Sequence, residues 1–115
     1  MITIEDIKTL FDDLRADSEW NVDGPLTWGY YFTDTDSERL QPLSAHLCEN
    51  GYHFVELYAT EDNRRYFLHL ERVERLRPET VLNRHRSMEE KAAEFGVEAF
   101  DGLDVDGPPP PPAKT

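Results

Sequence analysis

The segment Leu26–Thr33 limits the possible folds of this chain more than any other part of its sequence. Large apolar residues occupy every second position, so that in an extended strand they all fall on one face. These residues are Leu26, Trp28, Tyr30 and Phe32. A strand with such a face has to bury it against a second layer of structure. The segment therefore predicts a sheet that has one face covered by helices.

One helix is predicted before this strand in the sequence and another after it. The first begins with Thr3 as its N-cap, continues with apolar residues at helical spacing, and ends near Ala16. The second follows the N-cap residues of Asp34–Ser37 and ends at Gly51, a residue type typical of helix C-termini. Because a proline inside a helix removes a hydrogen bond, Pro42 predicts that this helix starts late or bends.

A third helix is predicted to begin at Pro78, where the missing N–H of proline costs nothing, and to end at Gly96. Its side chains at helical spacing form a predicted buried stripe of Val81, His85, Met88, Ala92 and Phe95. A short last strand is expected to follow directly at Val97–Phe100.

Two more alternating segments, Tyr52–Ala59 and Arg64–Val73, are predicted strands joined by a hairpin turn at Thr60–Asn63. After the first helix, the order is then strand, helix, strand, strand, helix, strand. This order is typical of a ferredoxin-like split βαβ sandwich, an α+β fold with an antiparallel sheet and helices on one face. We therefore expect a single α+β domain over residues 1–107, with an extra N-terminal helix.

Acidic residues outnumber basic ones by 24 to 12, which gives a net charge of −12, and the excess is unevenly distributed. Residues 61–91 hold eight basic and seven acidic side chains, so that four basic and 17 acidic ones lie in the rest of the chain. Such a surface repels a phosphate backbone and attracts a basic protein, although acidity also serves solubility alone. The acidic residues expected to meet a basic partner are Asp12, Asp13, Asp17, Glu19, Asp34, Asp36, Glu38, Asp101, Asp104 and Asp106.

The sequence offers no motif for catalysis or for metal binding. The four histidines lack the strand or helix spacing of a metal site, and there is neither a Gly-x-Ser-x-Gly motif nor a glycine-rich phosphate loop. These histidines are His46, His53, His69 and His85. We therefore expect a protein that is not an enzyme and has no metal and no cofactor.

The single cysteine and the apolar segments indicate a cytoplasmic protein. Cys48 has no partner for an internal disulfide and is expected to be a small buried residue in a reducing compartment. No stretch reaches the roughly 20 apolar residues of a spanning helix, and the first residues do not resemble a signal peptide. We expect no contact with a membrane.

The sheet face opposite the predicted core has aromatic side chains, expected at Tyr31, Phe54, Tyr58, Phe67 and His69. RNA-recognition domains use such a face to stack bases, but they also need cations, and only Arg64 and Arg65 lie nearby in the sequence. Covering by the N-terminal helix or binding of a protein therefore ranks ahead of RNA binding.

The run Phe95-Gly-Val-Glu-Ala-Phe-Asp-Gly-Leu103 resembles the C-terminal signature of the regulators of ribonuclease E activity, type B. In that family a helix ends in Phe-x-Val-Glu and leads into Tyr-Asp-Gly-Trp, where this chain has Phe100 and Leu103. The resemblance extends over about residues 3–107. The positions that match the family pattern are Phe95, Val97, Glu98, Phe100, Asp101 and Gly102.

The resemblance implies a ferredoxin-like fold and a function without catalysis. Members of the family bind an endoribonuclease that initiates RNA decay and inhibit its action on some transcripts. We therefore predict a regulatory protein that binds a basic surface of an endoribonuclease and does not bind nucleic acid directly. The candidate protein-binding residues are Asp34, Asp36, Glu38, Glu98, Phe100, Asp101, Asp104 and Asp106.

Two other functions remain open at this point. A small acidic immunity or antitoxin-like protein, which neutralises a basic toxin, would have the same charge and size. A nucleic-acid-binding module is the third reading, and it rests on the aromatic sheet face alone.

The last residues of the chain give a first testable prediction. Gly107 is followed by five prolines, which offer no N–H donors to a sheet and no large side chains to a core. We expect residues 108–115 to be a disordered Pro-rich tail, so that truncation before Pro108 leaves the melting temperature unchanged within error. A drop of several degrees in a thermal melt would show that the tail docks on the domain.

Overall fold

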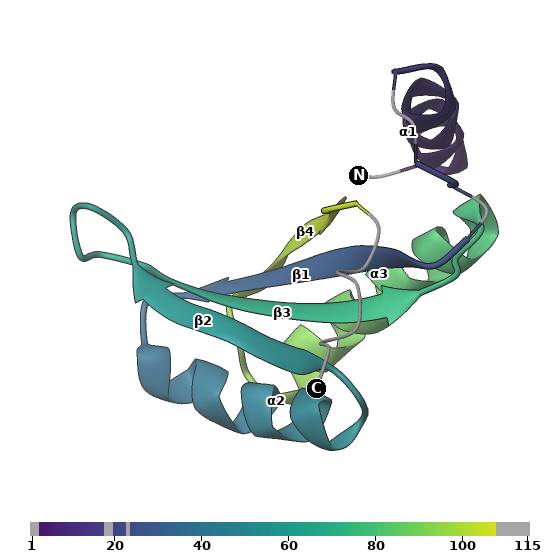
Figure 1. Ribbon diagram of the computed structural model, residues 1–115. Helices are drawn as coiled ribbons and strands as arrows, with labels where there is room; N and C mark the ends of the chain where they lie inside the picture. Colours follow the sequence, from purple (N-terminus) through teal and green to yellow (C-terminus); the bar gives the residue numbers. More distant parts are fainter. Residues whose placement is uncertain (1–2, 18–19, 23, 108–115) are drawn as a thin grey trace, which may run out of the picture.

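The computed structural model describes residues 3–17, 20–22 and 24–107, and the predicted tail of residues 108–115 lies outside them. The elements in chain order are α1 (Ile4–Asp17), β1 (Leu26–Asp34), α2 (Ser37–Glu49), β2 (His53–Ala59), β3 (Tyr66–Glu74), α3 (Pro78–Glu94) and β4 (Ala99–Val105). The strands form one antiparallel sheet in the order β2-β3-β1-β4, with α2 and α3 on the same side of it (Figure 1). This arrangement confirms the predicted ferredoxin-like α+β fold.

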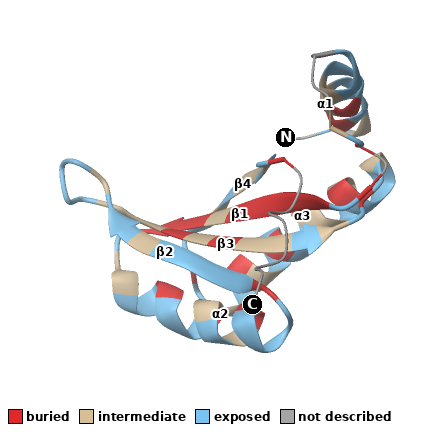
Figure 2. Ribbon diagram, viewed as in Figure 1, coloured by how far each residue is buried: buried red, intermediate tan, exposed pale blue. Residues whose placement is uncertain are grey.

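The core lies between the sheet and these two helices, and β1 is its centre (Figure 2). All four large residues of the alternating segment are buried, and Tyr30 and Phe32 are fully enclosed. They meet Leu68 and Leu70 of β3, which are also fully buried. Burying each such side chain contributes about 1.5–3 kcal/mol, so this layer supplies much of the driving force for folding.

Side-chain caps fix where the first two helices begin. At the start of α1, Asp6 N–H donates to Thr3 Oγ1 at 3.2 Å, and Thr3 N–H donates to the Asp6 carboxylate at 3.0 Å. The predicted cap at Thr3 is thereby confirmed. At α2, Asp36 accepts a hydrogen bond from the N–H of Glu38 at 2.9 Å, and the helix starts at Ser37.

The prediction of a late start for α2 is wrong. Pro42 lies inside the helix and is exposed. Its ring removes a single hydrogen-bond donor from the ladder. The cap at Asp36 and the buried stripe of Leu40, Leu43 and Leu47 hold the turns on both sides of it. Cys48 is also exposed, contrary to the prediction, because it follows Leu47 by about 100° of helical rotation and so leaves the stripe.

The last strand begins later and runs further than the sequence suggested. Gly96, at φ 69°, ends α3: its N–H donates to Ala93 O at 3.1 Å, and Val97 N–H donates to Ala92 O at 2.8 Å. These two bonds are those of a Schellman motif. Because the N–H of Val97 closes the helix, β4 starts only at Ala99. On α3, Val81, Met88 and Ala92 are buried as predicted, whereas His85 and Phe95 are only partly buried.

Two β-bulges change which side chains share a face. In β2, the register shifts between Phe54 and Glu56, and in β4 it shifts opposite Tyr31 and Phe32. Phe54 pairs with Leu70, a core residue, and therefore lies on the helix side of the sheet, not on the opposite face as predicted. A bulge inserts one residue, and so it reverses the alternation on which the prediction depended.

Helix α1 packs on α3 rather than over the sheet (Figure 1). Its residues Ile7 and Phe11 are buried, and the ring of Phe11 stacks on Trp28 with the centroids 5.9 Å apart. The sheet face opposite α2 and α3, which we call the open face, is not covered by any helix of the described residues. Covering by α1 is therefore excluded as the role of its aromatic side chains.

These contacts predict that α1 is an integral part of the folded domain. Replacing Phe11 with alanine removes a buried ring and is expected to lower the free energy of unfolding by about 3–5 kcal/mol. Thr9→Ala on the exposed side of the same helix should change it by less than about 0.5 kcal/mol. Urea denaturation followed by tryptophan fluorescence measures both, and equal effects of the two substitutions would contradict the packing of α1.

Candidate functional site

Asp34, at the end of β1, ties together three separate segments of the chain. Its side chain has no exposed surface. One carboxylate oxygen accepts the N–H of Asp36 at 2.8 Å, and the other accepts the N–H of Glu98 at 2.9 Å. Arg39 of α2 lies 3.7 Å from the first oxygen. Because it is buried, Asp34 contributes to a binding surface only through the residues that it holds in place.

The charge of this buried carboxylate is stabilised by its surroundings. Burial by itself raises the pKa of Asp34, but the N–H groups of Asp36 and Glu98 and the charge of Arg39 outweigh it. The net result is a pKa below the ordinary value of 3.8. Asp34 is therefore ionised at neutral pH, and its charge is balanced from within the fold.

Of the other acidic candidates near Asp34, Glu38 and Glu98 are exposed and Asp36 is half-buried. Glu38 lies in the first turn of α2, and Asp36 precedes it as the cap. Glu98 binds Arg65 of β3's hairpin, with Nη2 and Oε1 only 2.7 Å apart, and Arg65 also donates to Thr33 at 3.2 Å. These carboxylates form one acidic group at the α2 end of β1, and part of its charge is already paired.

The family signature has a structural explanation residue by residue. Phe95 and Gly96 end α3, Val97 is buried, and the backbone of Glu98 is held by Asp34. Phe100 points into the helix side, where its ring lies 5.0 Å from Phe32 and 5.1 Å from His85. The positive φ of Gly102, 139°, favours glycine there. Most of the signature thus shapes the connection from α3 to β4.

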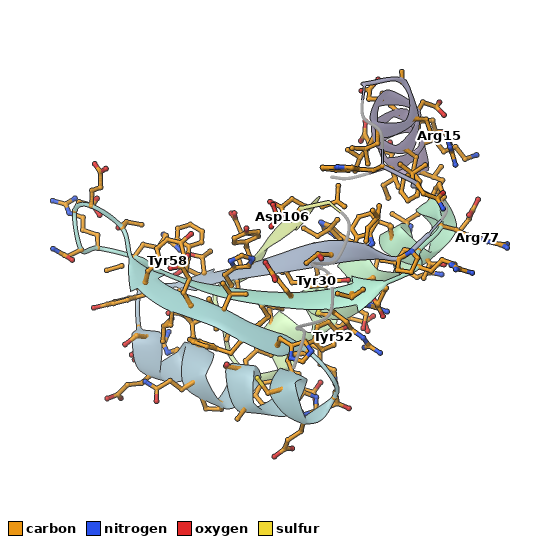
Figure 3. All side chains as sticks on the ribbon, viewed as in Figure 1. Arg15, Tyr30, Tyr52, Tyr58, Arg77 and Asp106 are labelled. Atoms are coloured by element: carbon orange, nitrogen blue, oxygen red, sulfur yellow. The ribbon has the colours of Figure 1, made fainter. Side chains whose placement is uncertain are left out.

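The acids of β4 lie on the open face or at its rim. Asp101 is the extra residue of the bulge and is exposed. Asp104 pairs with Gly29 of β1, and a Cβ atom at Gly29 would lie 2.6 Å from the Asp104 carboxylate. The glycine therefore leaves the room that this carboxylate occupies. Asp106 directly follows β4, and its N–H donates to the carbonyl oxygen of Thr27 in β1. In Figure 3, Asp106 and Tyr58 both lie on the side of the sheet opposite α2.

Aromatic rings stand beside these acids. Tyr31 stacks on His69 with centroids 4.3 Å apart, and Tyr58 stacks on Phe67 at 5.7 Å. The Tyr31 hydroxyl reaches the Asp104 carboxylate at 3.5 Å. The strand register therefore confirms four of the five predicted aromatic positions of the open face, and only Phe54 lies elsewhere.

The open face also has two carboxylates, Glu56 and Glu71, that were not among the predicted site residues. The register places Glu56 opposite His69 and Glu71 opposite Gly29. Alternation along β3 already put Glu71 on the side of Phe67, and alternation along β2 put Glu56 on the side of Tyr58, so both signals were available in the sequence. Among the described strand residues that face away from the helices, none is a lysine or an arginine.

The acids of α1 lie apart from this surface. Asp12 and Asp13 are exposed, and Asp12 is 3.5 Å from Arg15. Of the other two acidic candidates in this region, the side chain of Asp17 and all of Glu19 lie outside the described residues. Helix α1 packs mainly on α3, and its stacking contact with β1 is at Trp28, on the helix side of the sheet, so its acids do not extend the open face.

The described residues 3–17, 20–22 and 24–107 bring together no group of three or more histidine, cysteine or carboxylate side chains able to hold a metal ion. In the same part of the chain, no helix is both long and apolar enough to cross a bilayer. What the surface offers chemically is carboxylate charge, ring faces and two exposed sheet edges.

The environment of Asp34 predicts how stability depends on pH. Because its folded pKa is depressed, the stability that it contributes is present above the ordinary pKa of 3.8 and is lost as the pH falls through the folded value. Asp34→Asn is expected to cost about 1–3 kcal/mol at pH 7, and this cost should shrink below about pH 4. Urea denaturation at several pH values measures it.

The exposed Asp13→Asn serves as the control, with a change below about 0.5 kcal/mol expected at pH 7. If the cost of Asp34→Asn stayed constant down to about pH 2, the carboxylate charge would not be what stabilises this junction.

Comparison with known proteins agrees with the geometry. No curated protein gives a significant match to this chain. The family model of the regulators of ribonuclease activity B, RraB, matches residues 4–105, from the first residue of α1 to the last residue of β4. The match covers most of the chain and confirms the resemblance seen in its C-terminal signature. The chain belongs to the RraB family of regulators of ribonuclease activity.

Proposed function

We propose that this protein is a non-catalytic inhibitor that binds an endoribonuclease of the ribonuclease E type through the acidic open face of its sheet. The observation that carries the proposal is the distribution of charge on that face. Asp101, Asp104 and Asp106 lie there beside Glu56 and Glu71, and no described strand residue on the face is a lysine or an arginine.

A ribonuclease has to attract a polyanion, and so it presents lysine and arginine side chains where RNA binds. A surface rich in carboxylates is complementary to such a site and speeds the encounter with it. It also repels free RNA, so that the protein competes with the substrate instead of binding it. An RNA-decay regulator of this kind works in the cytoplasm.

Inhibition by occupancy requires no catalytic group in the inhibitor. Two of the carboxylates near the end of β1 have structural contacts: Asp34 binds two backbone N–H groups, and Glu98 binds Arg65. An immunity-like protein for a basic toxin would use the same face, but membership of a family of ribonuclease regulators favours the ribonuclease as partner.

Neutralising the acids of β4 tests this proposal. The variant Asp101→Asn/Asp104→Asn/Asp106→Asn is expected to associate with ribonuclease E several-fold more slowly, because its steering charge is removed. Cleavage of an RNA substrate should then be inhibited less at the same protein concentration. Surface plasmon resonance measures the association rate, and gel assays measure cleavage.

A matched control removes the same charge elsewhere. Glu5→Gln/Asp12→Asn/Asp13→Asn alters three exposed carboxylates of α1 and should leave association nearly unchanged. For the intact protein, the rate should fall as salt is raised, since the Debye length shortens to about 8 Å at physiological ionic strength. Equal effects of the two triple variants would mean that the open face is not the interface.

A further inference from the structure

The open face contains a hollow that crosses the sheet from β2 to β4. Its volume is about 410 Å³, and its lining includes Tyr31, Tyr58, Phe67, Asp101 and Asp104. The rings come from β1, β2 and β3, and both carboxylates come from β4. We propose that this hollow binds an arginine side chain from an extended, arginine-rich segment of a protein partner. The proposal rests on the function proposed above and names the chemistry of the partner.

Ring faces and carboxylates together are what a guanidinium group requires. Its plane stacks on an aromatic ring, and its N–H groups donate in a fixed fork to carboxylate oxygens. In the hollow, Tyr58 and Phe67 are nearly parallel, with 19° between their planes. The Asp104 carboxylate lies over Gly29, which leaves room for it, and accepts a hydrogen bond of 3.5 Å from the hydroxyl of Tyr31.

On the helix side of the sheet, tyrosine rings and a carboxylate bind arginine side chains of the chain itself. There, Arg84 lies over the ring of Tyr30 at 5.9 Å and donates to both oxygens of Glu74, at 2.6 and 3.0 Å. Arg72 lies over the ring of Tyr52 at 5.0 Å and also contacts Glu74, at 3.1 Å. On the open face, tyrosines and carboxylates are present, but the face has no arginine of its own among the described strand residues.

Burial and neighbouring carboxylates raise the pKa values of the two tyrosines in the hollow. Burial, followed by the charge of Asp104, raises the pKa of Tyr31 to about 12. Burial, followed by the charges of Glu56 and Asp101, raises the pKa of Tyr58. Carboxylates thus contribute to the shift of both tyrosines, and an incoming cation would relieve that contribution.

The pKa of the Asp104 carboxylate is raised as well, but chiefly by burial. Burial is the largest cause that raises its pKa; His69 opposes the shift, and Asp106 adds to it. Arg65 approaches the face at Thr33, but its guanidinium is paired with Glu98 at 2.7 Å. An RNA strand would bring phosphates toward these carboxylates and be repelled, whereas an arginine uses both the rings and the charge.

Binding of two synthetic peptides to the full-length protein tests the proposal. In one peptide arginine alternates with glycine and serine, and in the other lysine replaces every arginine; fluorescence anisotropy measures the affinity of each. The arginine peptide is expected to bind several-fold more tightly, although the charges are equal, because lysine lacks the planar fork. Equal affinities would overturn the proposal.

Substitutions in the hollow provide a second test of the proposal. Asp101→Asn should weaken binding of the arginine peptide about tenfold or more, since it removes a charge-assisted hydrogen bond. Tyr58→Leu should weaken it about two- to five-fold, as expected for one exposed cation–π contact. Circular dichroism verifies that both variants are folded.

The matched controls change the same residue types outside the hollow. Phe54→Leu removes an exposed ring on the helix side of β2, and Asp12→Asn removes an exposed charge on α1. Neither should alter the affinity. Hollow variants that bind like these controls would overturn the proposal, and so would direct binding of a labelled single-stranded RNA oligonucleotide to the protein, without peptide, that is lost in Tyr58→Leu.

The peptide and ribonuclease experiments test the two proposals independently, so that either one can be contradicted without the other. If the triple variant of β4 loses inhibition of ribonuclease E while the two peptides bind equally, the proposed function stands and the arginine hollow is wrong. If the peptides behave as expected but inhibition is unaffected by the triple variant, the hollow binds arginine and the proposed function is wrong.

Discussion

The buried carboxylate of Asp34 is the interaction on which the arrangement of this fold depends. It lies where β1 ends, where α2 begins and where the chain returns from α3 to β4, and it binds a backbone N–H from each of the last two segments. A buried charge is costly unless it is fully satisfied, so the carboxylate allows only the geometry in which both N–H groups reach it. The position of β4 beside β1 follows from this constraint. The acids carried by β4 are thereby brought to the open face.

The two faces of the sheet use similar residues in opposite ways. On the helix side, tyrosines and Glu74 enclose Arg84, and the group is completed within the chain. On the open face, tyrosines and aspartates are left without an arginine of the chain among the described strand residues. A carboxylate that faces water costs little in the free protein, but it forms charge-assisted hydrogen bonds when a guanidinium group binds beside it. This difference is the physical basis for regarding the open face as the binding surface.

The family signature shapes the connection from α3 to β4, and it also carries one carboxylate of the proposed binding surface. Its first half ends α3 through the Schellman motif at Gly96 and buries Val97, and these features explain why glycine and an apolar residue are needed there. Its second half adds the bulge at Asp101, which moves a carboxylate to the rim of the hollow. The residues that this chain shares with the RraB family therefore determine mainly how β4 is formed. The position of the β4 carboxylates follows from the geometry of that strand.

The sequence by itself determined the fold class, the order of the elements and the acidic character, because alternation, helical periodicity and charge are local properties of a chain. It also identified the family from one short run of residues. Only the tertiary structure decided that the buried Asp34 joins three segments of the chain and that Phe54 leaves the open face. Burial depends on contacts between segments far apart in sequence, and a bulge of one residue reverses the alternation that any strand pattern assumes. For the same reason the hollow was not predictable, since its rings and carboxylates come from four strands and meet only when the sheet is assembled.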